Sequence, residues 1–152
     1  YLFMNLGAFF VVITVQNKTG GETFDDYKGL GWEMPMIGIV MTIFMVSLTG
    51  LPPTAGFIGK FYIFASLIKG GNEFYWLVMI GGINSVISLF YYLRVVKVMY
   101  FEGESHEKIV QPPTVMAALL LATAIPTVLL GVSWTPIADW VQRSLIFFIQ
   151  TL

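Results

Sequence analysis

Cysteine is absent from the 152-residue sequence, and charged side chains are scarce. Without a thiol, the chain can form no disulfide, no thiolate zinc site and no cysteine-ligated iron–sulfur cluster. Charged residues make up 11% of the chain, against roughly 25% in ordinary soluble domains. The net charge of −1 provides no basic surface for nucleic acid, and no glycine-rich nucleotide fingerprint follows a predicted strand.

Long apolar stretches dominate what is present. The chain is 57% hydrophobic and 16% aromatic, and its mean hydropathy is +0.78. No charge occurs over 74–93 or 109–138, and Lys60 is the only charged residue between Met34 and Ile68. Uncharged apolar stretches of 18 or more residues are typical of transmembrane helices. The sequence therefore predicts an all-α integral membrane protein.

Four membrane spans and an amphipathic tail are expected. The spans cover 2–16, 34–69, 74–100 and 114–132, the second is broken at 50–53, and the tail over 136–150 is expected to lie along the membrane interface. The first apolar segment begins at Tyr1 without a basic region before it, unlike a signal peptide. We therefore expect the numbered chain to be the C-terminal part of one transmembrane domain in a longer protein.

The connectors carry most of the charge. Within 17–33 a short interfacial helix is predicted over 23–29, with Thr23 as its N-cap. The connectors 17–33 and 94–112 hold five basic residues, and the opposite side of the membrane holds two. The positive-inside rule therefore places both connectors in the cytoplasm and the C-terminus outside.

The second span is too long for one straight helix. At 1.5 Å per residue its length would be roughly 54 Å, against about 30 Å of hydrocarbon. We expect two half-helices, over 35–49 and 53–69, joined by an unwound linker, because adjacent prolines remove backbone donors and flanking glycines permit non-helical dihedrals. The alternative is a re-entrant hairpin of two short spans. The residues expected to make the break are Gly50, Pro52, Pro53, Gly56 and Gly59.

Lys60 follows the break and is the main candidate for chemistry. A lysine at the centre of a membrane helix costs about 2.5–3.5 kcal/mol on insertion scales, so such residues are usually functional. Removal from water disfavours the charged form of a lysine, so the side chain can more readily release and take up a proton. We expect Lys60 to transfer protons. The alternatives are a structural lysine paired with an acid on another segment and a lysine that binds an anionic substrate.

Other polar residues give weaker signals. On the third span, one helical face carries polar and small side chains that line a hydrated path or serve helix packing; these are Gly81, Asn84, Ser85, Ser88 and Tyr92. Thr123 and Thr127 are expected to bond their own helix, and Pro126 to kink it. His106, the only histidine, is expected on a solvated surface, so no metal site is predicted.

Three stretches together resemble a known family. They are SLTGLPPTAGFIGKF at 47–61, DDYKGLG at 25–31 and YYLRVVK at 91–97. The first resembles the antiporter-like membrane subunits of respiratory complex I and Mrp-type antiporters. The combination is more specific and resembles the subunit N family of bacterial NADH-quinone oxidoreductase, over essentially the whole chain.

The resemblance implies a fourteen-helix antiporter-like bundle with two inverted five-helix repeats, of which this chain supplies the last four spans. Lys60 matches the family's lysine on the discontinuous helix of the second repeat, where it serves as the outer proton site. The glutamate and lysine of the first repeat have no counterpart in this sequence. No cofactor is expected on this chain; FMN, iron–sulfur clusters and quinone are expected elsewhere in the complex.

The functional expectation is proton translocation without redox chemistry on this chain, in the inner membrane of a bacterium. The expected partners are other complex I membrane subunits, lipid and protons, with no nucleic acid. The alternatives are an Mrp-type cation/proton antiporter, a ferredoxin-fed photosynthetic complex I and a purely structural membrane subunit.

Overall fold

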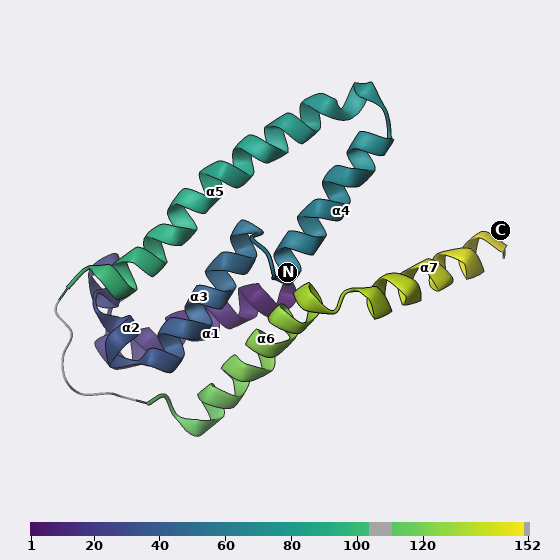
Figure 1. Cartoon of the computed structure of the whole chain (residues 1–152). Coiled ribbons are helices and arrows are strands. Elements are labelled where there is room, and N and C mark those ends of the chain that lie inside the picture. Colours follow the sequence, from purple (N-terminus) through teal and green to yellow (C-terminus); the bar gives the residue numbers. More distant parts are fainter. Residues whose placement is uncertain (104–110, 151–152) are drawn as a thin grey trace.

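The computed structural model describes residues 1–103 and 111–150, and every regular element in that part of the chain is a helix (Figure 1). In chain order these are α1 (Leu2–Thr19), η1 (Phe24–Tyr27), α2 (Leu30–Glu33), α3 (Pro35–Thr49), α4 (Ala55–Lys69), η2 (Asn72–Phe74), α5 (Tyr75–Phe101), α6 (Thr114–Val132) and α7 (Thr135–Gln150). The all-α expectation is confirmed for the described residues. His106 lies outside them.

Helices occupy the places that the sequence predicts, with small differences at the ends. α3 has the predicted bounds because Pro35 suits a first helical turn and Gly50 ends the helix with φ +82°, a left-handed conformation that favours glycine. α1 runs three residues further than 2–16 and ends at Thr19, before Gly20. α4 begins two residues later than expected, because Thr54 is extended and its hydroxyl donates to the Leu51 carbonyl oxygen at 2.7 Å.

The first connector is more ordered than the sequence suggests. The helix expected over 23–29 is the shorter η1, where the Asp26 carboxylate accepts from the Thr23 backbone N–H at 2.8 Å and hydroxyl at 2.7 Å. These bonds hold the pKa of Asp26 below its usual value. The one-turn helix α2 was not predicted. Its residues tie the connector to α1 and α5, since Glu33 pairs with Lys18 at 2.7 Å and the Trp32 indole donates to the Tyr100 carbonyl at 2.9 Å.

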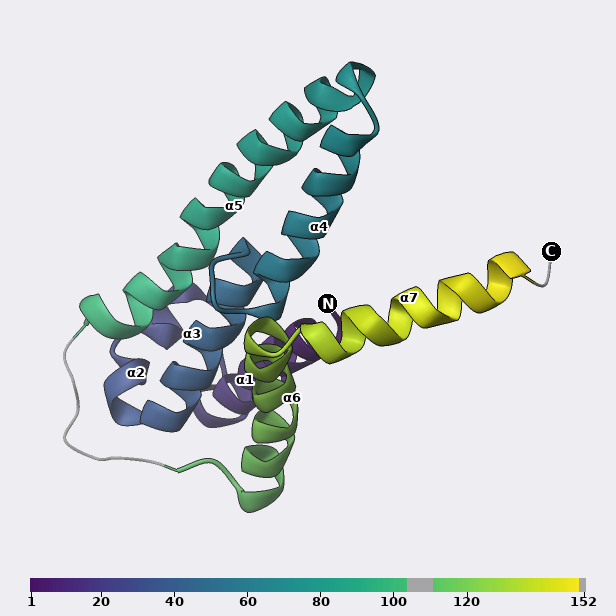
Figure 2. The same ribbon diagram turned by 45° about the vertical axis from the view of Figure 1, so that its right-hand side comes forward.

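The half-helices α3 and α4 point the same way (Figures 1 and 2). After α3 the chain loops back beside its end, and α4 then continues in the direction of α3, displaced sideways. A re-entrant hairpin would reverse direction at the linker, so the common direction favours a discontinuous helix, which stays a prediction. α5 returns antiparallel to α4 and contacts both half-helices.

The core lies where α1, α3, α5 and α6 meet. Val11, Ile37, Phe44, Met99 and Leu120 are each fully buried there. α1 packs behind α3 and α6 in the view of Figure 1. The approach of α1 to α3 depends on Gly7, because a Cβ at this position would overlap the ring of Phe44. This packing fixes α3, and with it the linker that follows.

Two helices among the described residues are long and apolar enough to cross a membrane, namely 72–101 and α6. The helical segment over 24–33 and α3 meet at Met34 with a bend of 117°. If the two are counted as one broken span, the described chain has three candidate spans. α3 and α4 have 15 residues each, and neither reaches the length of a single span. The count of four spans remains a prediction.

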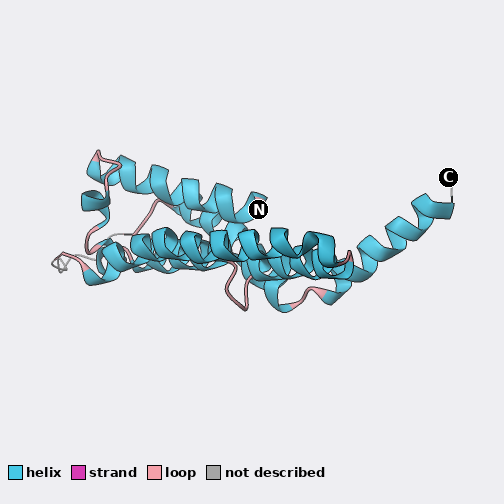
Figure 3. Cartoon of the chain, turned by 90° about the horizontal axis from the view of Figure 1, so that it is seen from above, coloured by secondary structure: helices cyan, strands magenta, loops and turns pink. Residues whose placement is uncertain are grey.

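The C-terminal helix α7 projects away from the rest (Figures 1 and 3). It packs against no other helix of the described chain. Its bounds lie close to the amphipathic tail predicted over 136–150, and its placement along the membrane interface stays a prediction.

Candidate functional site

The linker between the half-helices spans residues 50–54, close to the predicted break. In a continuous helix, the N–H groups of residues 52 and 53 would bind the carbonyl oxygens of Leu48 and Thr49. Both positions are proline and have no N–H. The double proline therefore frees two adjacent carbonyl oxygens at the C-terminal end of α3.

The side chain of Lys60 binds one of these two carbonyl oxygens. Its side chain reaches back from α4 across the linker, and Nζ donates to the Thr49 carbonyl oxygen at 2.8 Å. The stem of Lys60 lies against Gly50, where a Cβ would be 2.6 Å from Lys60 Cδ. The C-terminal end of a helix carries roughly −0.5 elementary charge, so the ammonium sits where the backbone favours a cation. The sequence suggests an acid on another segment as the partner of a structural Lys60, whereas the partner in the structure is a backbone oxygen of the same chain.

The facing ends of α3 and α4 are in direct contact. The buried Ser47 hydroxyl accepts from the Gly56 backbone N–H at 3.2 Å and donates to the Met4 sulfur at 3.3 Å. A Cβ at position 56 would overlap the Ser47 carbonyl oxygen. Ser47 thus satisfies an N–H in the first turn of α4, which has no acceptor within that helix.

The last turn of α6 covers the linker from another side. A Cβ at Gly131 would overlap the Pro53 carbonyl oxygen and lie 2.5 Å from Thr54 Cα. The linker is therefore held between three helices by glycines that let backbones approach. Gly56 and Gly59 both lie inside α4, and Gly59 differs from Gly56 because open space surrounds its Cβ position.

The serine hydroxyls on the polar face of α5 form hydrogen bonds within their own helix. The Ser85 hydroxyl donates to the Gly81 carbonyl at 2.9 Å, and the Ser88 hydroxyl donates to the Ser85 carbonyl at 2.8 Å. Asn84 is exposed, and Tyr92 packs against the core with its ring 4.6 Å from that of Tyr91. In the described residues, no hydrogen bond joins this face to Lys60. A hydrated path along it remains a prediction.

Two further expectations concern α6 and metal binding. Thr123 donates to the Leu119 and Leu120 carbonyls and Thr127 to the Thr123 carbonyl, which confirms that both hydroxyls bond their own helix. Over 1–103 and 111–150, no three potential metal ligands of the His, Asp or Glu type lie together.

Comparison with known proteins identifies the family. Residues 1–88 match the family described as NADH:quinone oxidoreductase/Mrp antiporter, TM. This is more than half of the chain and includes α3, the linker and Lys60. The chain belongs to this family.

Relatives narrow the position within this family. The chain is 49% identical over 146 residues to "NADH-quinone oxidoreductase subunit N 2" of Sorangium cellulosum, covering 95% of this chain and 29% of that protein. It is 43% identical over 152 residues to "NADH-quinone oxidoreductase subunit N" of Chlorobium chlorochromatii, covering 97% and 30%. A third relative, the subunit N of Moorella thermoacetica, is 34% identical over 150 residues.

These matches confirm the resemblance seen in the three sequence stretches. Family membership and the apolar helices together identify an integral membrane protein. The chain spans about three-tenths of the length of the relatives it matches.

Proposed function

We propose that this chain takes part in proton translocation as a section of a membrane subunit of NADH-quinone oxidoreductase, with Lys60 as the titrating group. The observation that supports this most is the bond from Lys60 Nζ across the helix break to the Thr49 carbonyl oxygen. Redox chemistry is assigned to other subunits, which would hold FMN, iron–sulfur clusters and quinone. Under this proposal the complex lies in the inner membrane of a bacterium, and the C-terminus of this chain lies on the outer side.

The break gives Lys60 two states that differ in their contact with the backbone. The ammonium form donates a charge-assisted bond to the Thr49 carbonyl, and hydrogen bonds of this kind are worth about 1.5–3 kcal/mol. The neutral amine is a weaker hydrogen-bond donor, and it has no net charge that the negative end of α3 could stabilise. A rearrangement that changes this difference by ~1.4 kcal/mol changes the ratio of charged to neutral lysine about tenfold.

Movement of the two half-helices is therefore a means of controlling the proton. The Lys60 stem is attached to α4, and its acceptor is on α3. A small displacement of one half-helix against the other lengthens the bond, because hydrogen bonds weaken steeply with distance and angle. Quinone reduction elsewhere in the complex would supply the driving change, and water at the linker would carry the proton away.

An Mrp-type cation/proton antiporter is the second candidate, because the matching family includes both kinds of protein. Its activity would be independent of NADH and would need a second cation such as sodium. A purely structural membrane subunit is the third, and it would not need the lysine at the break to titrate.

Inverted membrane vesicles that carry the assembled complex distinguish the three. Under the proposal, NADH oxidation acidifies the vesicle interior without added sodium, Lys60→Ala removes most of this acidification, and Lys60→Arg keeps the charge but loses proton exchange. Sodium-driven proton movement without NADH would identify the antiporter. Normal acidification in the alanine variant would leave only the structural role.

A further inference from the structure

A groove along α5 has a different character from the Lys60 site. It has a volume of about 630 Å³ and is lined by Val86, Leu89, Phe90, Leu93, Arg94, Lys97 and Glu102. The α5 members recur at three- and four-residue intervals, so they form one stripe on a single face of the helix. Val86 is 68% exposed and Phe90 is 76% exposed, so the stripe is not covered by the other helices of the described chain.

The polarity of the groove changes along its length. Its long part is aliphatic and aromatic, and one end carries two cations. Arg94 and Lys97 are three residues apart and lie on the same helical face. Within the described part of the chain, no carboxylate lies at ion-pair distance from Arg94, whose guanidinium is 4.9 Å from the centre of the Phe24 ring.

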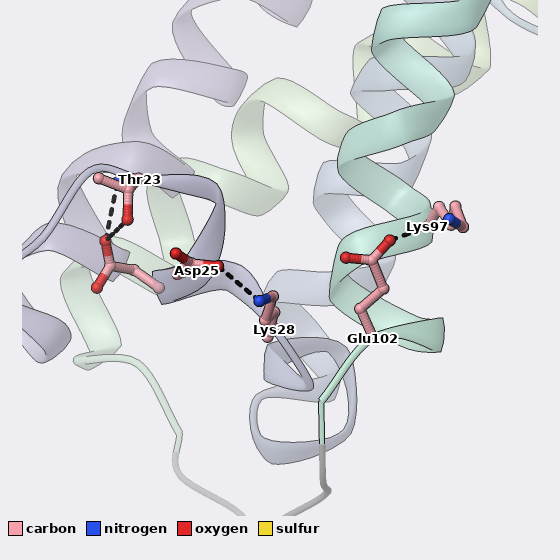
Figure 4. Close-up of polar contacts among 6 residues, drawn as sticks. Thr23, Asp25, Lys28, Lys97 and Glu102 are labelled. Carbon is pink, nitrogen blue, oxygen red and sulfur yellow. Dashed lines mark hydrogen bonds and ion pairs between the residues drawn. The ribbon is translucent and has the colours of Figure 1, made fainter.

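Lys97 is partly neutralised by Glu102, whose carboxylate lies 3.0 Å from its Nζ (Figure 4). Asp25 is the main cause of the raised pKa of Lys28 in the first connector, and the charge of Glu102 raises it further. The groove end therefore carries an excess of positive charge, with one cation free of any acid among the described residues and one held by a displaceable acid.

The cations lie at the end of the uncharged apolar stretch of α5. The uncharged stretch over 74–93 ends immediately before Arg94, and Lys97 and Glu102 are the next charged residues, in the last two turns of α5 and directly after it. Trp32 and Tyr100 pack edge to face at this end of α5, with ring centroids 5.6 Å apart. Paired amphipathic aromatics and basic side chains at the end of an apolar helix mark the level of the lipid headgroups.

We propose that this groove binds an anionic phospholipid. The guanidinium of Arg94 and the ammonium of Lys97 hold the phosphate, and one acyl chain lies along the stripe from Leu93 to Val86. Guanidinium groups bind phosphate oxygens through two parallel hydrogen bonds. A basic site at the end of an apolar groove is complementary to a lipid with net negative charge, and a zwitterionic lipid would bring its own cation against Arg94.

The test uses the assembled complex in membranes that contain a photoactivatable phosphatidylglycerol with the reactive group in its acyl chain. Labelling of residues 86–93 is measured by mass spectrometry. We expect Arg94→Gln/Lys97→Gln to reduce labelling about tenfold. Arg94→Lys/Lys97→Arg keeps both charges and should keep the labelling, and Glu102→Gln should increase it because Lys97 is released. Lys69→Gln, an exposed cation on α4, should leave it unchanged.

Three results would overturn the proposal. The first is equal labelling by a matched phosphatidylcholine probe, which would show a site without charge selectivity. The second is undiminished labelling in the double glutamine variant. The third is a photoreactive residue at position 90 that crosslinks to protein instead of lipid, which would show that another polypeptide segment fills the groove. If the double glutamine variant does not assemble, the Arg94→Lys/Lys97→Arg variant is measured in its place. Loss of labelling in that variant would also contradict the proposal.

Discussion

Lys60 of α4 donates to the Thr49 carbonyl oxygen of α3 at 2.8 Å, across a linker whose two prolines leave that oxygen without its helical partner. The linker thus supplies the acceptor for the lysine that follows it. The break and the charged residue work as one unit, because either alone would leave an unsatisfied polar group in an apolar region.

Restoring the two missing backbone donors should separate Lys60 from the helix break that supplies its acceptor. In Pro52→Ala/Pro53→Ala, the new N–H groups can bind the Leu48 and Thr49 carbonyls, extend α3 and displace Lys60. We expect slow hydrogen exchange at positions 52 and 53, together with reduced NADH-driven proton movement. Fast exchange at both amides with full proton movement would show that the break is not held open by the prolines.

Gly56 and Gly59 form a matched pair on α4. Gly56→Ala forces a methyl group into the Ser47 carbonyl, whereas Gly59→Ala projects into open space in this chain. Overpacking costs about 1–3 kcal/mol, so the first variant should lower the melting temperature of the purified complex. The second should leave the melting temperature unchanged or slightly higher, because alanine favours a helix. Equal effects of the two would contradict the close approach of α3 and α4.

Gly50 has two reasons to be glycine. Its φ of +82° is unfavourable for other residues, by about 1–2 kcal/mol, and a Cβ there would meet the Lys60 stem. Gly50→Ala should therefore reduce both stability and proton movement, whereas Gly20→Ala, at a φ of +77° with open space around it, should reduce stability alone. Loss of proton movement in the Gly20 variant as well would attribute the effect to backbone strain rather than to Lys60.

Ser47 provides a test of the contact between the half-helices. Ser47→Ala leaves the buried Gly56 N–H without its acceptor, at a cost of about 1–3 kcal/mol. A lower melting temperature is expected, with partial rescue by Ser47→Thr, which keeps the hydroxyl. An alanine variant as stable as the parent would mean that the α4 N–H finds another acceptor.

Much of this arrangement could be predicted from the sequence. The double proline, the excess length of the 34–69 stretch and the single charge at Lys60 locate the break and the candidate residue, because each is a local property of the chain. The freed carbonyl of Thr49 was also within reach, since counting four residues back from Pro53 finds it. A buried lysine is usually paired with an acidic side chain, so the sequence favours an acid over this backbone oxygen as the partner of Lys60.

Other parts of the site depend on which helix faces which. Nothing in the local sequence around Gly131 indicates that α6 ends against Pro53, because residues 78 positions apart meet only after the bundle packs. The sequence predicts Gly59 as part of the break from its closeness to the prolines, whereas the structure has it inside α4 with open space around it. The one-turn helix α2 was missed because four residues are too few to show a helical period.

If Lys60 exchanges the proton that the complex moves, the number of protons moved per NADH oxidised, measured in vesicles carrying the assembled complex, depends on this lysine. Lys60→Ala should lower this ratio, and Lys69→Ala, which removes an exposed cation at the end of the same helix, should leave it at the parental value. A parental ratio in the Lys60→Ala complex, assembled to normal amounts, would contradict the account.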